Sequence, residues 1–146
     1  MPRKKRRESM IKAEHENELM VRFKDGEVLP DGLVELGVSS GVIVNGVGML
    51  RDLELGYWDG EKYVIERISE PVELLSLQGN IGERDGETMV HAHVTVAKKG
   101  GAAYGGHILR GTVNNTAEVF IYRLDRIRLV RKVEETGLAG LYPETD

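Results

Sequence analysis

The stretch from Gly79 to Leu109 constrains the fold of this chain more than any other part of the sequence. The run MVHAHVTVA has the composition of a β-strand and is followed by a glycine-rich connection. A three-residue hairpin loop at 99–101 would place Lys98 opposite Ala102. Counting outward from that pair, His93 lies opposite His107. The stretch therefore predicts an antiparallel hairpin with a defined register.

Three of the four histidines of the chain fall on this hairpin. Successive side chains of a strand point to opposite faces, so His91 and His93 share one face. Directly opposed Cβ atoms lie about 4.5–5.5 Å apart, which brings His107 to the same patch. Gly105 and Ala103 would lie opposite Thr95 and Ala97, so that face is uncrowded. We therefore expect three imidazoles to converge.

Convergent imidazoles predict a site for zinc or another divalent metal, with His91, His93 and His107 as ligands. Three protein ligands leave one coordination position open. A one-residue register slip, or a bulge at Gly105-Gly106, would remove His107 from the site. The alternative is three ordinary strand histidines, hydrogen-bonded or facing solvent. The third histidine, rather than the His-Ala-His pair alone, favours the metal site.

The rest of the sequence predicts an α+β fold, a mostly antiparallel β-sheet with one or two flanking helices. One short helix is expected over 27–36, with Pro30 in its first turns. Turns or breaks are expected at five dipeptides, Asp25-Gly26, Asp59-Gly60, Gly79-Asn80, Asp85-Gly86 and Asn114-Asn115. Asn45-Gly46 is a candidate bulge or turn. The further expected strands span 18–24, 42–47, 50–58, 63–68, 71–77, 117–124 and 126–133.

The length and composition limit the class of protein to which this chain can belong. At 146 residues the chain is expected to be one domain, 18–134, with a disordered, charged tail at 1–17 and a C-terminal tail at 135–146. Hydrophobic content is 40% and aromatic content 5%, so the core must be aliphatic. Cysteine is absent, which excludes disulfides and thiolate metal sites and suits a cytoplasmic protein. No run of 18 apolar residues is present, so we expect no membrane span.

The charge is divided unevenly along the chain. A basic cluster near the start, Arg3, Lys4, Lys5, Arg6 and Arg7, contributes +5, while the whole chain carries −4, so the remainder carries −9. An acidic body is a poor surface for phosphate backbones, which makes the cluster the expected nucleic-acid contact. A nuclear import signal, a merely solvated tail, and a true start at Met10 are the alternatives.

Several segments taken in order resemble the plant-and-prokaryote-conserved (PPC) domain. They are VRFKDGE, GVGMLRDLELGYWD, PVELLSLQGNI, HAHVTVA, YGGHIL and TAEVFIYRL, between about Leu19 and Leu124. The resemblance implies an antiparallel sheet with flanking helices and assembly as a homotrimer. Plant members carry AT-hooks ahead of the domain and bind DNA. The basic cluster here lacks the Arg-Gly-Arg-Pro core of an AT-hook, so selective reading of the minor groove is not expected.

The fold is also similar to that of acetolactate decarboxylase, a zinc enzyme that uses a His-x-His pair and a later histidine. The resemblance implies His91, His93 and His107 as the corresponding positions. The decarboxylase's further carboxylate ligands and its arginine have no matched positions here.

Three functions follow as hypotheses. The first is a zinc-binding homotrimeric module with a DNA-binding or regulatory role through the basic tail. The second is a metal-dependent enzyme acting on a small keto or hydroxy acid, with Glu73, Glu87 and Glu118 as candidate acid–base groups. The third is a structural metal, or a metal-free small-molecule pocket between trimer subunits lined by Asn80 and Arg110.

Overall fold

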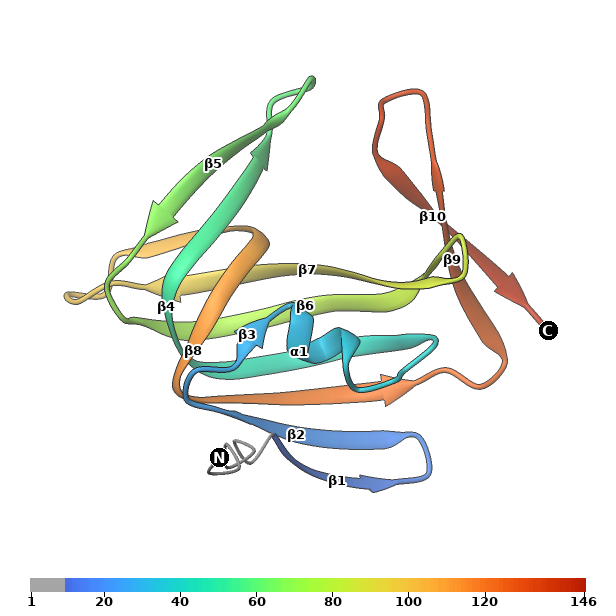
Figure 1. Cartoon of the computed structure of the whole chain (residues 1–146), viewed down its shortest axis with the longest axis horizontal. Coiled ribbons are helices and arrows are strands. Elements are labelled where there is room, and N and C mark those ends of the chain that lie inside the picture. Colours follow the sequence, from blue (N-terminus) through green and yellow to red (C-terminus); the bar gives the residue numbers. More distant parts are fainter. Residues whose placement is uncertain (1–9) are drawn as a thin grey trace, which may run out of the picture.

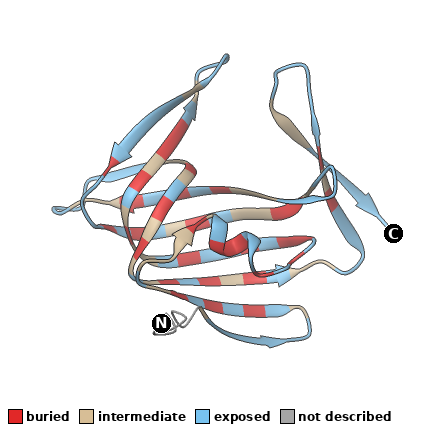
Figure 2. Ribbon diagram, in the orientation of Figure 1, coloured by how far each residue is buried: buried red, intermediate tan, exposed pale blue. Residues whose placement is uncertain are grey.

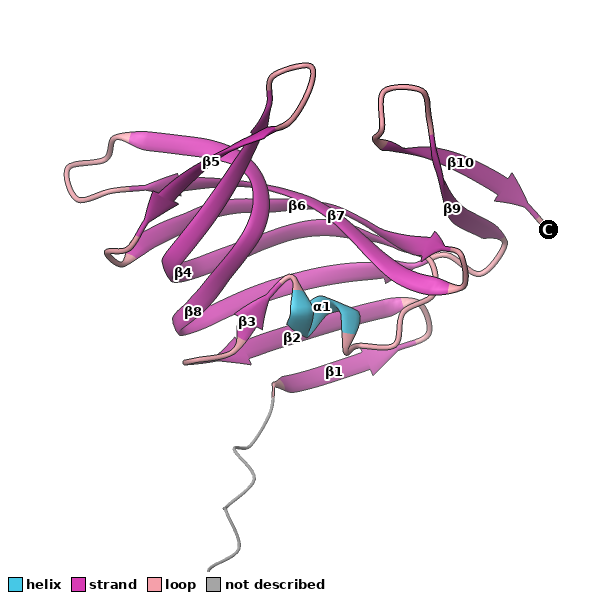
Figure 3. Cartoon of the chain, turned by 45° about the horizontal axis from the view of Figure 1, so that its top comes forward, coloured by secondary structure: helices cyan, strands magenta, loops and turns pink. Residues whose placement is uncertain are grey.

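The computed structural model describes residues 10–146 (Figure 1). Its elements are β1 (Ile11–His15), β2 (Glu18–Lys24), β3 (Val28–Leu29), α1 (Asp31–Val34), β4 (Gly41–Trp58), β5 (Tyr63–Ile68), β6 (Val72–Arg84), β7 (Glu87–Ala97), β8 (Ala103–Arg123), β9 (Ile127–Val133) and β10 (Ala139–Thr145). Strands dominate this part of the chain, and Figure 3 shows how little of it is helical.

The strands form one sheet in the order β1-β2-β8-β4-β6-β9-β10, with β3 on β8 and β5 on β4. Strand β7 pairs with both β6 and β8, and these two strands both pair with β4. The four strands β4, β6, β7 and β8 therefore form a closed circuit of paired neighbours. The pairings are antiparallel except for a single parallel pair between β6 and β9. Hairpins β4–β5 and β9–β10 project from the same side of the sheet (Figures 1 and 3).

The core follows from the alternation of side chains along the strands. In β2, Leu19, Val21 and Phe23 are fully buried while Met20 between them is exposed. Figure 2 shows the same alternation of buried and exposed residues along the long strands. The buried cluster is almost wholly aliphatic, with Phe23 as its only aromatic member. The low aromatic content therefore predicts the kind of core that is observed.

The helix is shorter than the sequence predicts. Only Asp31–Val34 is helical, because residues 28 and 29 form β3 instead and the chain turns away at Gly37, which has φ +71° and lies three residues beyond Val34. A Cβ at Gly32 would lie 2.8 Å from the Phe23 ring, so this turn packs closely on β2. The expected mostly antiparallel sheet is therefore confirmed, but the α+β class is corrected to a mostly β fold, because the single described helix has four residues.

Two expected breaks are continuous strand. Strand β6 runs through Gly79-Asn80, and β8 runs through Asn114-Asn115. Gly79 is required by close approach, because a Cβ there would lie 1.9 Å from the carbonyl oxygen of His91 on β7. Asn115 has φ +67°, which lets β8 bend without ending.

Four other local predictions are confirmed. Asp59-Gly60 and Asp85-Gly86 lie at the β4–β5 and β6–β7 turns, and the register of β4 against β8 shifts between Ile43 and Asn45. The fourth is the loop at 99–101, described below. No helix in residues 10–146 has the length and apolar character needed to cross a membrane.

Strands also lie within both segments expected to be tails. Within 1–17, strand β1 pairs with β2 from Ile11↔Arg22 to His15↔Glu18. Within 135–146, strand β10 pairs with β9. Neither strand has a buried side chain. They are held by backbone pairing at the sheet edges, which leaves no hydrophobic pattern for sequence reasoning to detect.

Candidate metal centre

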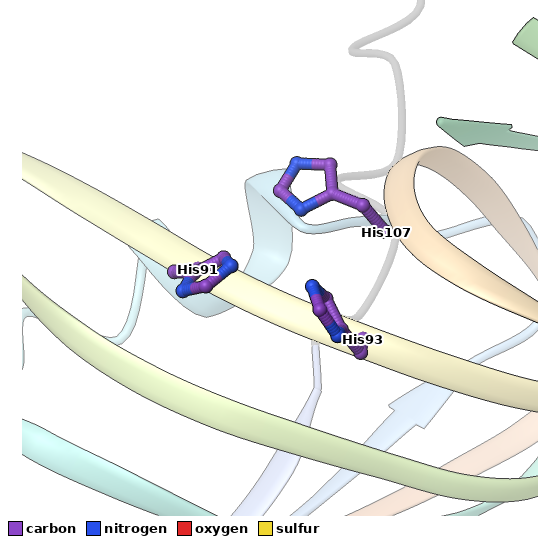
Figure 4. A group of neighbouring side chains, drawn as sticks. All are labelled: His91, His93 and His107. Atoms are coloured by element: carbon purple, nitrogen blue, oxygen red, sulfur yellow. The ribbon is translucent and has the colours of Figure 1, made fainter. Parts of the chain in front are cut away.

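Three histidine rings converge where β7 meets β8 (Figure 4). One ligating atom from each of His91, His93 and His107 lies within 4.8 Å of the others. The ring centroids are 5.0 Å apart for His91–His93, 5.5 Å for His91–His107 and 5.7 Å for His93–His107. The predicted convergence is confirmed as geometry.

The hairpin turn sets this arrangement. The Lys98 amide donates to the Ala102 carbonyl at 2.9 Å, and Gly101 donates back to Lys98 at 2.9 Å. Gly100 and Gly101 have φ of +95° and +87°, values that favour glycine. The register then runs from Ala97↔Ala103 to His93↔His107 without a shift, so Gly105-Gly106 forms no bulge against β7.

The surroundings favour the neutral form of two of the rings, His91 and His107. Burial is the main cause that lowers the pKa of His91 to about 4, followed by the nearby charge of Arg131 and by the other two histidines. Burial, followed by the neighbouring His93, also lowers the pKa of His107. Neutral imidazole is the form that binds metals. The His107 Nδ1 atom is buried and has no hydrogen-bond partner among residues 10–146.

The donor set fits a divalent metal that accepts nitrogen ligands. Three imidazoles supply one nitrogen each, and no carboxylate of residues 10–146 belongs to the group. A metal held this way has only neutral protein ligands and at least one open coordination position. Such a metal would act as a Lewis acid or would lower the pKa of bound water.

Arg131 on β9 is a site residue that the sequence analysis missed. Its Nη2 donates to Asn80 Oδ1 at 2.8 Å and lies 3.2 Å from His91 Nδ1. Its Nη1 donates to the Ala139 carbonyl at 3.0 Å. The residue is only 7% exposed, and its Nε is buried without a hydrogen-bond partner in the part of the chain that the structure describes. The alternating run RIRLVRKV suggested an edge strand, and nothing in it marks this arginine as the inward one.

Tyr63 on β5 is a second missed residue. Its ring stacks on His107 with centroids 5.2 Å apart and an interplanar angle of 26°. Gly56 of β4 pairs with His107, and a Cβ at Gly56 would lie 2.8 Å from the Tyr63 ring. The missing side chain of Gly56 therefore makes room for the stack. The Asp59-Gly60 dipeptide predicts the β4–β5 hairpin, but it does not predict that Tyr63 of this hairpin contacts His107 on β8.

The other residues predicted for the functional site do not all lie at the histidine group. Asn80 lies at the site, paired with His91 across β6 and β7 and bonded to Arg131. Arg110 is exposed on β8, where its register partner is Glu54. Glu73, Glu87 and Glu118 are exposed, and none belongs to the histidine group. The cluster Arg3, Lys4, Lys5, Arg6 and Arg7 lies outside the described residues.

Comparison with solved structures gives close matches over almost the whole chain. A PPC protein from Pyrococcus horikoshii is 30% identical with a TM-score of 0.80, over 95% of this chain and 97% of that chain. A metal-containing protein from Archaeoglobus fulgidus is 31% identical with a TM-score of 0.80, over 88% and 95%. A protein from Bacteroides thetaiotaomicron, described as a candidate DNA-binding protein, is 24% identical with a TM-score of 0.84, over 91% and 96%.

The fold and the histidine group together define a small β-rich protein with a candidate three-histidine metal centre. A family model described as the Plants and Prokaryotes Conserved (PCC) domain, the PPC domain of the solved structures, matches residues 10–125. This chain therefore belongs to the PPC family, as its sequence motifs indicate. A comparison with curated protein sequences gives no match.

Proposed function

We propose that this protein is a metal-binding PPC module in which His91, His93 and His107 hold one zinc ion or a similar divalent metal. The observation that carries the proposal is the convergence of three ligating atoms within 4.8 Å. The depressed pKa of His91 and His107 supports it, because both rings are then available to a metal below neutral pH. The relative from Archaeoglobus fulgidus is itself described as metal-containing.

The test is the metal content of the full chain, purified without an affinity tag or chelator. We expect about one zinc per chain in the natural sequence and none in a His91→Ala, His93→Ala double variant. His15→Ala is the matched control, because His15 is an exposed histidine on the edge strand β1, which pairs with neither β7 nor β8. No zinc in the natural chain, even after zinc is added, would exclude the metal-binding proposal.

Homotrimeric assembly is the second part of the proposal. It follows from the resemblance to the PPC family and is supported by exposed apolar side chains on strands that are adjacent in the sheet. These residues are Met20, Val42, Val44, Val47, Leu75 and Tyr122, all 38–50% exposed. They lie on the face opposite the core, since their chain neighbours Leu19, Ile43, Leu74 and Ile121 are buried. A monomer by light scattering would contradict this part.

Contact with DNA through the basic cluster is the third part of the proposal. It is motivated by five positive charges within the first seven residues and by the description of the Bacteroides relative. Three such tails on one trimer would bind multivalently. This contact would be electrostatic and would carry no sequence preference.

A metal-dependent enzyme acting on a small keto or hydroxy acid is the second candidate function. The observation that favours it is that the histidine group supplies only three ligands, which would leave a coordination position of a bound metal open to substrate. Turnover of acetolactate by the zinc-loaded chain is the first assay. Absence of turnover across a panel of keto and hydroxy acids, with zinc bound, would exclude the enzyme function. The metal-binding module would then be the remaining proposal.

A further inference from the structure

We infer that Arg131 is a ligand-positioning residue, whose guanidinium loses its hydrogen bond to His91 when a metal binds and then pairs with a small carboxylate beside that metal. The inference rests on the proposed metal site. It goes beyond that site by assigning the chemical class of its ligand and the side chain that recognises it.

The first step concerns the contact between Arg131 and His91. A guanidinium can only donate hydrogen bonds, so at 3.2 Å the His91 Nδ1 atom must accept with its lone pair. A metal at Nδ1 would take that same lone pair. A metal at Nε2 would place the ring hydrogen of a neutral imidazole on Nδ1, where it faces a second donor. On either nitrogen, metal binding removes the acceptor that Arg131 uses.

The second step concerns the donors that Arg131 then presents. Its Nε is buried and already without a partner, and its Nη2 loses one of two acceptors when His91 binds a metal. An Arg donor pair such as Nε and Nη2 matches the two oxygens of a carboxylate. The bonds from Nη2 to Asn80 and from Nη1 to Ala139 are unaffected by the metal, so they hold the group in place.

The third step concerns charge. Three neutral histidines leave the full +2 charge of a zinc ion uncompensated, and Arg131 adds another positive charge beside it. No Asp or Glu of residues 10–146 belongs to the histidine group. The zinc ion and the Arg131 guanidinium would then be two positive charges close together, and Arg131 is only 7% exposed. Such a pair favours a bound anion. A carboxylate can satisfy both, with an oxygen on the metal and the guanidinium fork on its oxygens.

Arg131 also lies outside the family match. The PPC model ends at residue 125, whereas Arg131 is on β9 and its backbone acceptor Ala139 is on β10. The metal ligands thus belong to the matched domain, and the β9–β10 hairpin supplies the anion-recognising group. On this inference the hairpin, rather than the histidine strands, determines which ligands the site accepts.

The experiment uses pyruvate as the probe and the full chain, stripped of metal and then loaded with zinc. Calorimetry measures two affinities for each variant. The first is the affinity of the metal-free protein for zinc, and the second is the affinity of the zinc-loaded protein for pyruvate. We expect Arg131→Met to bind zinc at least as tightly as the natural chain and to bind pyruvate at least about 10-fold more weakly. Arg131→Lys, which keeps the charge but loses the fork, should bind pyruvate with intermediate affinity.

Arg128→Met is the matched control. Arg128 lies on the same strand, but its guanidinium is exposed and pairs with Glu83 and Glu144, so both affinities should be unchanged. A direct readout is the ¹⁵N–¹H resonance of Arg131 Nε, which should shift when pyruvate is added to the zinc-loaded protein. Metal-free protein should bind no pyruvate, because Arg131 is then held by His91.

The outcomes separate the two proposals. Absence of zinc binding in the natural chain removes the metal site and this inference with it. Zinc binding with no pyruvate binding, or with equal pyruvate affinity in the natural chain and Arg131→Met, overturns the inference and leaves the metal site intact. Pyruvate binding that does not depend on zinc also overturns it.

Discussion

His93 on β7 lies directly across the hairpin from His107 on β8, with ring centroids 5.7 Å apart. This single cross-strand pair joins two segments of the chain into one histidine group. His91 joins the group because it is two residues from His93 on the same strand face. The site therefore depends on the register of one hairpin more than on any longer-range packing.

Removal of His107 should abolish tight metal binding, since it is the only ligand candidate on β8. We expect His107→Ala to weaken zinc binding by more than the roughly 10- to 100-fold that is typical when only a ligand's hydrogen-bond partner is lost. A competition titration with a chromophoric chelator measures the change. His15→Ala should keep the natural affinity, and an unchanged affinity in His107→Ala would show that β8 supplies no ligand.

The stability of the metal-free protein should fall in acid. The folded state holds the pKa of His91 at about 4, against 6.5 for an ordinary histidine, and it also lowers that of His107. The unfolded chain therefore takes up protons first as the pH falls, and folding is disfavoured progressively from about pH 6.5 down to about 4. Above pH 6.5 both states hold neutral rings and this effect vanishes.

Melting temperatures of chelator-treated protein between pH 7.5 and 4 test this dependence. His91→Gln should show a shallower loss than the natural chain, because one of the responsible rings is gone. His15→Gln should follow the natural chain. Parallel curves for the natural chain and His91→Gln would mean that His91 is not held neutral by the fold.

Gly79→Ala should disrupt the pairing of β6 with β7. The added Cβ would lie 1.9 Å from the His91 carbonyl oxygen, so the strands must separate next to a candidate metal ligand. We expect a loss of about 3 kcal/mol or more in unfolding free energy, at the upper end of overpacking costs, together with weaker zinc binding. Chemical denaturation measures the first quantity. Glu73→Ala, which truncates an exposed side chain on the same strand, should change it little.

Deletion of residues 1–9 should abolish DNA binding if the basic cluster makes the contact. With five charges per chain, the logarithm of the binding constant for duplex DNA should fall with the logarithm of salt concentration with a slope of about −4.5 for one engaged tail. Fluorescence anisotropy at several salt concentrations gives this slope. Replacement of Arg3, Lys4, Lys5, Arg6 and Arg7 by glutamine, at full length, separates charge from chain length. Equal binding by the shortened chain would place any DNA contact on the acidic body instead.

Local signals in the sequence were sufficient for the histidine hairpin. Strand alternation put His91 and His93 on one face, and the glycine pair at 100–101 defined the loop that places His107 opposite. These relations depend on backbone geometry within 17 residues of chain, so no distant contact was needed to infer them. The aliphatic core likewise followed from composition.

Contacts between residues far apart in the sequence determined the features that local sequence signals could not predict. Gly79 resembles a turn residue, but it is a place where β7 approaches β6, and this depends on the whole sheet. Strands β1 and β10 bury no side chains, so backbone pairing and exposed ion pairs such as Arg128–Glu144 hold them at the sheet edges. Arg131 reaches His91 from 40 residues away only because β9 lies beside β6. By itself the sequence determined which histidines converge as candidate metal ligands, because strand geometry is local. The tertiary structure decided which charged group lies beside them, because that depends on how the strands are ordered in the sheet.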